Sequence, residues 1–192
     1  MNKFSYSLFP SDRKAYVFLV SSDGFLGKKI RIFMKLKNRL LHKPTTNIVN
    51  HADLYINGSV IGALAEGIVA KDLGGMYDDG CHRKIYIYEV PLDKENKNIL
   101  YSWVISKLGT PYEYSNFFNH IYRIIYLALY GREKWLGHTG DHAGHRYFCS
   151  EFVSTALTEV MPTFSLSPWD DDPMDLKELC DTKLTYVTTI KF

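Results

Sequence analysis

The residue whose type and position best suit chemistry is Cys149. It stands at the start of a segment with helical periodicity, directly after a stretch rich in glycine and histidine. A helix N-terminus carries partial positive charge and N–H groups without intrahelical partners, and both stabilise a thiolate. The same N–H groups can hold the oxyanion that develops on a substrate carbonyl. Position alone leaves two readings open, a nucleophile or a buried structural cysteine, because free cysteines are commonly inert core residues.

His51 is the histidine best placed to act as a base for such a cysteine. It immediately precedes the apolar segment 52–64, so its ring should lie at the end of a strand. The base of a nucleophilic cysteine is adjacent to it in space rather than in sequence. A lone histidine at a strand start is usually structural or solvated, so His51 gains a catalytic role only together with Cys149.

Three other histidines form an H-x3-H-x2-H run that contains an aspartate. The residues are His138, Asp141, His142 and His145. Spacing of this kind can ligate zinc. The run is interleaved with glycines, lacks helix-forming residues and has no paired Cys-x-x-Cys, so its geometry is not fixed. We therefore predict no metal site and no cofactor, and we interpret the run as a loop that leads into the cysteine helix.

Composition limits the classes to which the chain can belong. Its 192 residues are 46% hydrophobic and 23% charged, as in a globular protein with a sizeable core. With 23 Lys+Arg against 21 Asp+Glu, the net charge of +2 gives no field that favours nucleic acid. Three cysteines are too few for a disulfide framework. We find no signal peptide and no apolar run of about 18 residues, and therefore expect a cytoplasmic protein.

Hydrophobic periodicity predicts the elements that would position these side chains. Buried or alternating apolar runs indicate strands at 14–21, 84–90 and 184–190. Asn57-Gly58 between two apolar runs predicts a hairpin of 52–56 with 59–64. Apolar residues three or four apart indicate helices over 25–41, 98–108, 116–130 and 148–160. No linker or internal repeat divides the chain, so we expect one α+β domain over residues 1–192.

Two segments of the chain resemble a known superfamily. Residues 147–153 (YFCSEFV) resemble the Tyr-x-Cys-Ser-Glu-Phe/Leu-Val signature of the circularly permuted papain-like hydrolases of the NlpC/p-sixty type. Residues 50–69 resemble their histidine strand, turn and following strand, and weaker similarities lie at 109–114 and 167–176. The resemblance covers about residues 15–180. It implies an antiparallel half-barrel sheet packed on the helix that carries the cysteine, with the histidine earlier in the chain.

The resemblance also implies the roles of individual residues. Cys149 would be the nucleophile, His51 the base, and a third polar residue would orient the imidazole and fix its tautomer. Glu66 is the expected third residue, because it follows on the strand beside the histidine strand. Asp53 is the alternative, although two residues along one strand should place it beside the ring rather than behind it.

Two further features of the matched segments affect the expected site. Tyr112 and Tyr147 are the expected substrate-binding residues. Gly62-Ala63 stands where many relatives have Glu-Ala, which leaves the identity of the acid open between the two candidates. In addition, Glu151 in the first turn of the cysteine helix is expected to stabilise the helix dipole.

The predicted function is a cysteine hydrolase that cleaves an amide (peptide or N-acyl) or ester bond through a thioacyl-enzyme. The alternatives are a thiol acyltransferase, a non-catalytic lipid- or peptide-binding module on the same scaffold, and a zinc-dependent module that uses the histidine run.

Two predicted helical segments indicate what kind of partner this protein could bind. Segment 25–41 carries a basic face and segment 116–130 is apolar nearly all round. A basic amphipathic helix can lie on an anionic membrane surface. Peripheral membrane contact is therefore one expectation, beside a peptide, N-acyl or lipid-like substrate. Ordinary solvation of the first segment and core packing of the second are the competing interpretation.

Overall fold

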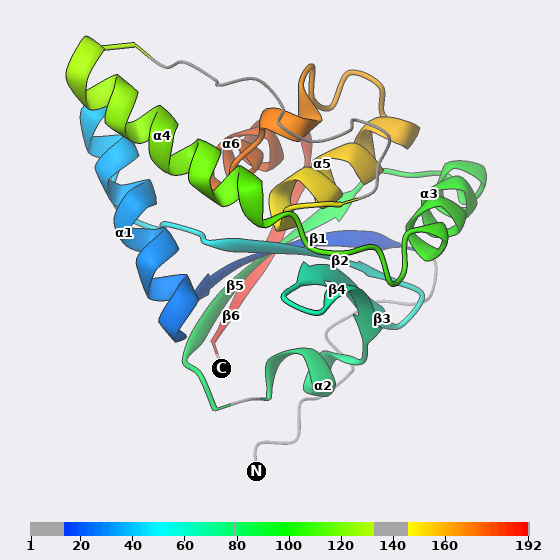
Figure 1. Ribbon diagram of the computed structural model, residues 1–192. Helices are drawn as coiled ribbons and strands as arrows, with labels where there is room; N and C mark the ends of the chain where they lie inside the picture. Colours follow the sequence, from blue (N-terminus) through cyan, green and yellow to red (C-terminus); the bar gives the residue numbers. More distant parts are fainter. Residues whose placement is uncertain (1–13, 79, 133–145, 192) are drawn as a thin grey trace.

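The computed structural model describes residues 14–78, 80–132 and 146–191. Within them, six strands form one open antiparallel sheet in the order β4-β3-β2-β1-β5-β6 (Figure 1). The strands are β1 (Ala15–Ser22), β2 (His51–Ile56), β3 (Ser59–Leu64), β4 (Gly67–Lys71), β5 (Arg83–Val90) and β6 (Thr185–Lys191). The α+β class expected from the sequence is confirmed.

Helices cover both faces of the sheet unequally. They are α1 (Phe25–Leu40), α2 (Leu73–Tyr77), α3 (Lys94–Ser106), α4 (Tyr114–Tyr130), α5 (Cys149–Val160) and α6 (Pro173–Lys183). The short α2 lies on one side of the sheet and the other five helices lie on the opposite side (Figure 1). None of the helices among the described residues is long and apolar enough to cross a membrane.

The central strand β1 is buried on both of its faces. Ala15, Val17 and Leu19 join the larger core, which includes Phe152 and Val153 of α5. The alternate residues Tyr16, Phe18 and Val20 join a smaller core with Leu73 and Met76 of α2. Burial on both faces explains why this strand appears in the sequence as a continuous apolar run rather than an alternating one.

The predicted hairpin is present with the expected turn. Asn57 and Gly58 have positive φ angles of 50° and 83°, the left-handed conformation that a two-residue hairpin turn requires. The turn sets the register of β2 against β3, so that Asp53 lies opposite Gly62.

Side-chain caps explain two differences between the predicted and observed helices. Helix α3 begins four residues before the predicted start, because the Asp93 carboxylate accepts the Asn96 N–H at 2.8 Å. Helix α6 was not predicted. It begins after Asp172, whose carboxylate accepts the N–H groups of Met174 and Asp175 at 2.8 and 2.9 Å.

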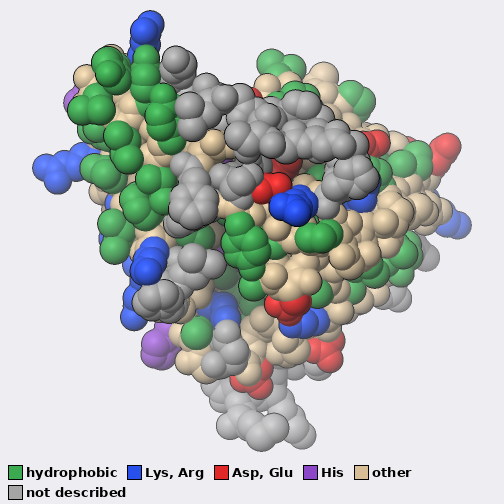
Figure 2. Space-filling view, viewed as in Figure 1, with side chains coloured by type: hydrophobic (Ala, Val, Ile, Leu, Met, Phe, Trp, Pro, Cys, Tyr) green, Lys and Arg blue, Asp and Glu red, His purple; other side chains and the backbone are tan. Residues whose placement is uncertain are grey.

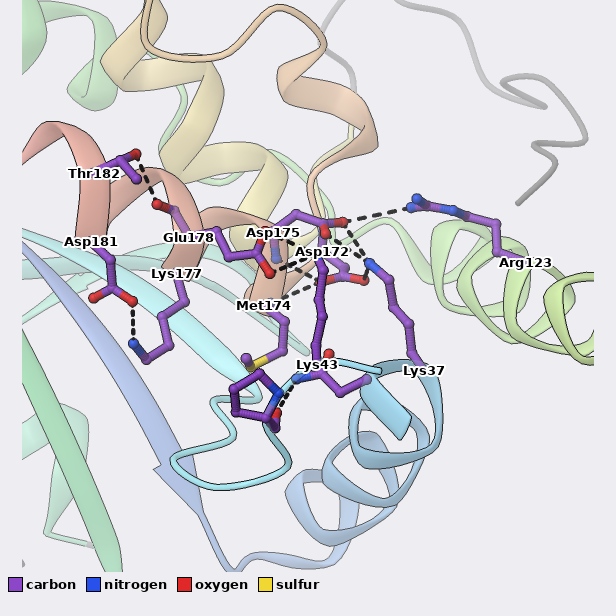
Figure 3. Close-up of polar contacts among 12 residues, drawn as sticks. Lys37, Lys43, Arg123, Asp172, Met174, Asp175, Lys177, Glu178, Asp181 and Thr182 are labelled. Carbon is purple, nitrogen blue, oxygen red and sulfur yellow. Dashed lines mark hydrogen bonds and ion pairs between the residues drawn. The ribbon is translucent and has the colours of Figure 1, made fainter. Parts of the chain in front are cut away.

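A buried ionic cluster joins three helices on the larger-core side (Figure 3). Lys37 of α1 places Nζ 2.6 Å from Asp172 Oδ2 and 2.8 Å from Asp175 Oδ1 at the start of α6. Arg123 of α4 lies 3.9 Å from Asp175 Oδ2. These four residues, the Lys37 cluster, hold α1 and α4 against α6.

In the Lys37 cluster, burial disfavours the charged form of each side chain, whereas a neighbouring opposite charge favours it. Burial opposes the charge on Lys37, but Asp172 and Asp175 raise the pKa of this lysine above its ordinary value. Burial and the neighbouring Asp172 raise the pKa of Asp175 to about 7. The two carboxylates therefore share one buried ammonium, and each depends on it to remain ionised.

Candidate active site

Cys149 is the first residue of α5, which places its thiol at the helix N-terminus. The first intrahelical bond runs from the Phe152 N–H to the Phe148 carbonyl at 2.9 Å. The backbone N–H groups of Cys149 and Ser150 therefore precede the helical hydrogen-bond ladder. The Glu151 carboxylate accepts the Phe148 N–H at 3.2 Å and so caps the start of the helix.

His51 begins β2, where its ring lies between Asp53 and Cys149. Ring atom Nε2 is 2.8 Å from Asp53 Oδ1, and the ring also interacts with the Cys149 thiol. Because Nε2 is engaged by the carboxylate, Nδ1 is the ring nitrogen left for the sulfur. Burial would lower the pKa of His51, but Asp53 and Cys149 raise it well above its ordinary value. This environment favours the imidazolium form of His51.

Asp53 is the acid that contacts the histidine. Its side chain is fully buried, and its second oxygen, Oδ2, accepts the hydroxyl of Tyr77 at 2.6 Å. Residues two apart on a strand share a face at a separation of about 6.6 Å, which an imidazole and a carboxylate span together. Tyr77 ends α2 and reaches Asp53 from the smaller core.

Glu66 lies elsewhere than the resemblance implied. It occupies the turn between β3 and β4, its side chain is 53% exposed, and its Oε1 pairs with Lys71 Nζ at 2.9 Å. The hydrogen bond from Lys71 lowers the pKa of Glu66. The ring nitrogen of His51 expected to meet Glu66 meets Asp53 instead, because the turn directs Glu66 toward solvent and Lys71.

Gly62 provides the space that the Asp53 carboxylate occupies. The two residues are cross-strand neighbours, and a Cβ on Gly62 would lie 1.7 Å from Asp53 Oδ1. No side chain fits there without moving the carboxylate. Glycine at position 62 is therefore what allows the carboxylate on the facing strand to occupy this place.

Gly62→Ala is expected to slow alkylation of Cys149 about tenfold with little loss of secondary structure, because displacing Asp53 weakens its hold on the His51 ring that activates the thiol. The rate is measured by mass spectrometry with iodoacetamide. Gly74→Ala is the matched control, since its Cβ would be 3.6 Å from its nearest neighbour. Alkylation of Gly62→Ala at the unaltered rate would mean that the position of Asp53 does not matter.

A pocket of about 190 Å³ opens beside the thiol and the imidazole. Its lining is largely apolar and includes Ile30 of α1, Leu64 of β3, Met76 of α2, and Tyr112 and Tyr114 near the start of α4. Whole drug-sized ligands occupy cavities of about 300 Å³ or more, so this pocket suits one apolar group of a substrate rather than all of it.

The two tyrosines expected to bind substrate lie in different environments. Tyr112 lines the pocket, and burial and the nearby Cys149 raise its pKa well above the ordinary value, which keeps the phenol neutral. Tyr147 is 5% exposed and packs edge-on against Trp103 and Phe152. Tyr147 is bridged through its backbone to Tyr112, but it is not itself among the residues that line the pocket, so its role in substrate binding stays a prediction.

The histidine run at 138–145 lies outside the described residues. Among the described residues, no group of three His, Cys, Asp or Glu side chains is arranged to hold a metal ion. The zinc alternative rests on residues outside that part of the chain and stays a prediction.

Comparison with known proteins does not assign this chain to a family. No protein-family model matches this chain, and no curated protein matches it. The arrangement of Cys149, His51 and Asp53 is accordingly the starting point for any functional assignment.

Proposed function

We propose that the protein is a cysteine hydrolase of the circularly permuted papain-like type, with Cys149, His51 and Asp53 as its triad. The observation that carries this proposal is the chain of contacts from thiol to imidazole to buried carboxylate beside one pocket. The order of the three roles is that of a nucleophile, a base and an orienting acid. The antiparallel sheet packed on the cysteine helix is compatible with that fold type.

In the proposed reaction, His51 accepts the proton of Cys149 and the sulfur attacks the carbonyl carbon of an amide or ester. The Cys149 N–H at the helix start stabilises the oxyanion. His51 then protonates the leaving amine or alcohol, and a thioacyl-enzyme remains. Water gives its proton to His51, attacks the thioester carbonyl, and releases a carboxylic acid with the free thiol.

Asp53 and Tyr77 hold the imidazole ready for both proton transfers. The bond from His51 Nε2 to Asp53 fixes the ring orientation and stabilises the imidazolium. The hydroxyl of Tyr77 in turn holds the carboxylate in place. Tyr77 is thus a positioning residue, which acts through Asp53 rather than on the substrate.

The acyl group that enters the pocket would be apolar, in line with its lining of aliphatic and aromatic side chains. Hydrolysis and acyl transfer share the first half of this mechanism and differ only in the acceptor of the acyl group. Both lead through the same covalent intermediate, which therefore provides the sharpest test.

The test is to trap the thioacyl-enzyme with p-nitrophenyl esters of short and medium-length fatty acids. Intact-mass spectrometry should show one added acyl group, located on the peptide that contains Cys149. Cys149→Ala should remove the adduct, and Cys81→Ala, the matched cysteine control, should keep it. If no acyl group is added, or if it persists in Cys149→Ala, the proposal is refuted.

Cys149 is also expected to react with iodoacetamide well before the other two cysteines. Cys81 is partly exposed, and Cys180 is fully buried with a pKa raised well above the ordinary value by that burial. Cys149 has little exposed surface but interacts with the His51 ring. His51→Ala should therefore abolish its advantage over Cys81. Equal rates at all three cysteines would contradict the nucleophile assignment.

A further inference from the structure

The outer face of α1 combines apolar and basic side chains. Ile32 is 65% exposed and Leu36 is 43% exposed, one helical turn apart. Lys28, Lys35 and Arg39 are exposed on the same side of the helix, at spacings of four, three and seven residues from Ile32. Residues 25–51 contain no aspartate or glutamate, so all charged side chains in this segment are basic.

The outer face of α4 extends the apolar part of this surface. Ile125, Leu129 and Tyr130 are 52%, 70% and 63% exposed. Residues 114–132 likewise contain no acidic side chain. Helices α1 and α4 contact each other and run side by side at one end of the molecule (Figure 1). Figure 2 shows hydrophobic side chains gathered over α4, with lysine and arginine side chains at the margin.

We propose that this surface, the α1/α4 face, docks on an anionic lipid bilayer. Its apolar part comprises Ile32, Leu36, Ile125, Leu129 and Tyr130, and its basic part comprises Lys28, Lys35 and Arg39. A bilayer offers an apolar layer next to anionic headgroups, which matches apolar tips flanked by cations. The absence of acidic residues from both helices removes the repulsion that such a surface would otherwise meet.

The α1/α4 face lies next to the candidate active site. The inward side of α1 contributes Gly27 and Ile30 to the pocket, and the first residue of α4, Tyr114, contributes to it as well. The Lys37 cluster ties the inward charges of the same two helices to α6. Docking through the outward sides would therefore hold the apolar pocket close to lipid. The docking itself does not depend on the triad being catalytic.

The experiment is co-sedimentation of the full chain with vesicles. The protein should bind phosphatidylcholine vesicles that contain phosphatidylserine much more tightly than vesicles of phosphatidylcholine alone. Binding to the anionic vesicles should weaken at high salt, because screening reduces attraction between the basic residues and the headgroups. Because the readout is binding, it distinguishes failure of this proposal from failure of the proposed function.

Two double variants show whether vesicle binding depends on the basic residues of the α1/α4 face or on the net charge of the whole chain. Lys35→Ala/Arg39→Ala should weaken binding to anionic vesicles about 30-fold, since each basic residue at the surface contributes about fivefold. The matched control, Lys94→Ala/Lys191→Ala, removes the same charge from exposed positions on α3 and β6 and should leave binding unchanged.

Apolar variants test the other component of the surface. Leu129→Ser should weaken binding about tenfold or more, because its side chain would no longer enter the bilayer. The control Ile99→Ser, at a position 46% exposed on α3, should have no effect. Circular dichroism of each variant checks that the fold is retained.

Three results would overturn the proposal. The first is a lack of preference for anionic over neutral vesicles. The second is an equal effect of the α1/α4 variants and their controls. The third is a dimer in sedimentation analysis that Leu129→Ser dissociates, since the face would then be covered by a second copy of the chain.

Discussion

Cys149→Ala and His51→Ala are each expected to abolish turnover while leaving the fold intact. Nucleophile and base act as a unit, so either change should lower kcat by about 10⁴-fold or more, and the double variant should lose little beyond that. Folding should survive because the thiol is small and His51 lies at the end of its strand. Steady-state kinetics on the ester that acylates the enzyme, with denaturation curves for each variant, provide the measurement.

Two observations would redirect the search for the active site. Full activity in Cys149→Ala would exclude the thiol mechanism. Loss of activity on addition of EDTA would turn attention to His138, His142 and His145, because the thiolate route needs no metal. Cys149→Ala that still binds substrate would, conversely, capture it from solution without consuming it.

The second large effect is expected from Lys37→Met, which should lower the free energy of unfolding by about 3–5 kcal/mol. Removing one partner of a buried ion pair leaves the other charges without compensation. Here Asp172 and Asp175 would lose the ammonium that lies 2.6 and 2.8 Å away. Chemical denaturation at neutral pH measures the loss.

Lys43→Met is the matched control for this prediction. Lys43 Nζ lies 2.7 Å from Oε1 of Glu178, which belongs to α6 (Figure 3). The two side chains are 36% and 52% exposed. A surface pair contributes about 0–1 kcal/mol, so this variant should be nearly as stable as the unaltered chain. Equal losses in the two lysine variants would contradict the importance of the buried position.

The loss in Lys37→Met should also depend on pH. Asp175 already has a pKa raised to about 7, and removal of Lys37 raises it further. A carboxyl whose pKa is higher in the folded than in the unfolded chain favours folding when protonated. The stability of the variant should therefore fall as pH rises from about 4 through 7. A loss that is equal at pH 5 and pH 8 would be inconsistent with buried carboxylates as its cause.

The sequence contained enough to predict the scaffold around the histidine. Asn57-Gly58 fixes a two-residue turn, and counting outward from it pairs Asp53 with Gly62. The pairing of an aspartate with a glycine could thus be predicted from the turn, whereas the burial of Asp53 could not. The expectation for Glu66 rested instead on strand adjacency and gave too little weight to contact between same-face residues of one strand.

Other parts of the site have no comparable signal in the sequence. Tyr77 belongs to a five-residue helix, Leu-Gly-Gly-Met-Tyr, which is too short and too rich in glycine to show periodicity. The sequence also does not distinguish Tyr112, which lines the pocket, from Tyr147, which is in the core. Their environments differ because tertiary packing turns one ring toward Cys149 and the other toward Trp103.

The close fit of Gly62 against Asp53 constrains how this chain can change over evolutionary time. A Cβ at position 62 would overlap Asp53 Oδ1, so any larger residue at position 62 requires the Asp53 carboxylate to leave the place where it contacts His51. The two positions are therefore epistatic, because the effect of a substitution at position 62 depends on whether position 53 keeps its aspartate. Homologues that carry a residue larger than glycine at position 62 should therefore differ from this chain at position 53 as well.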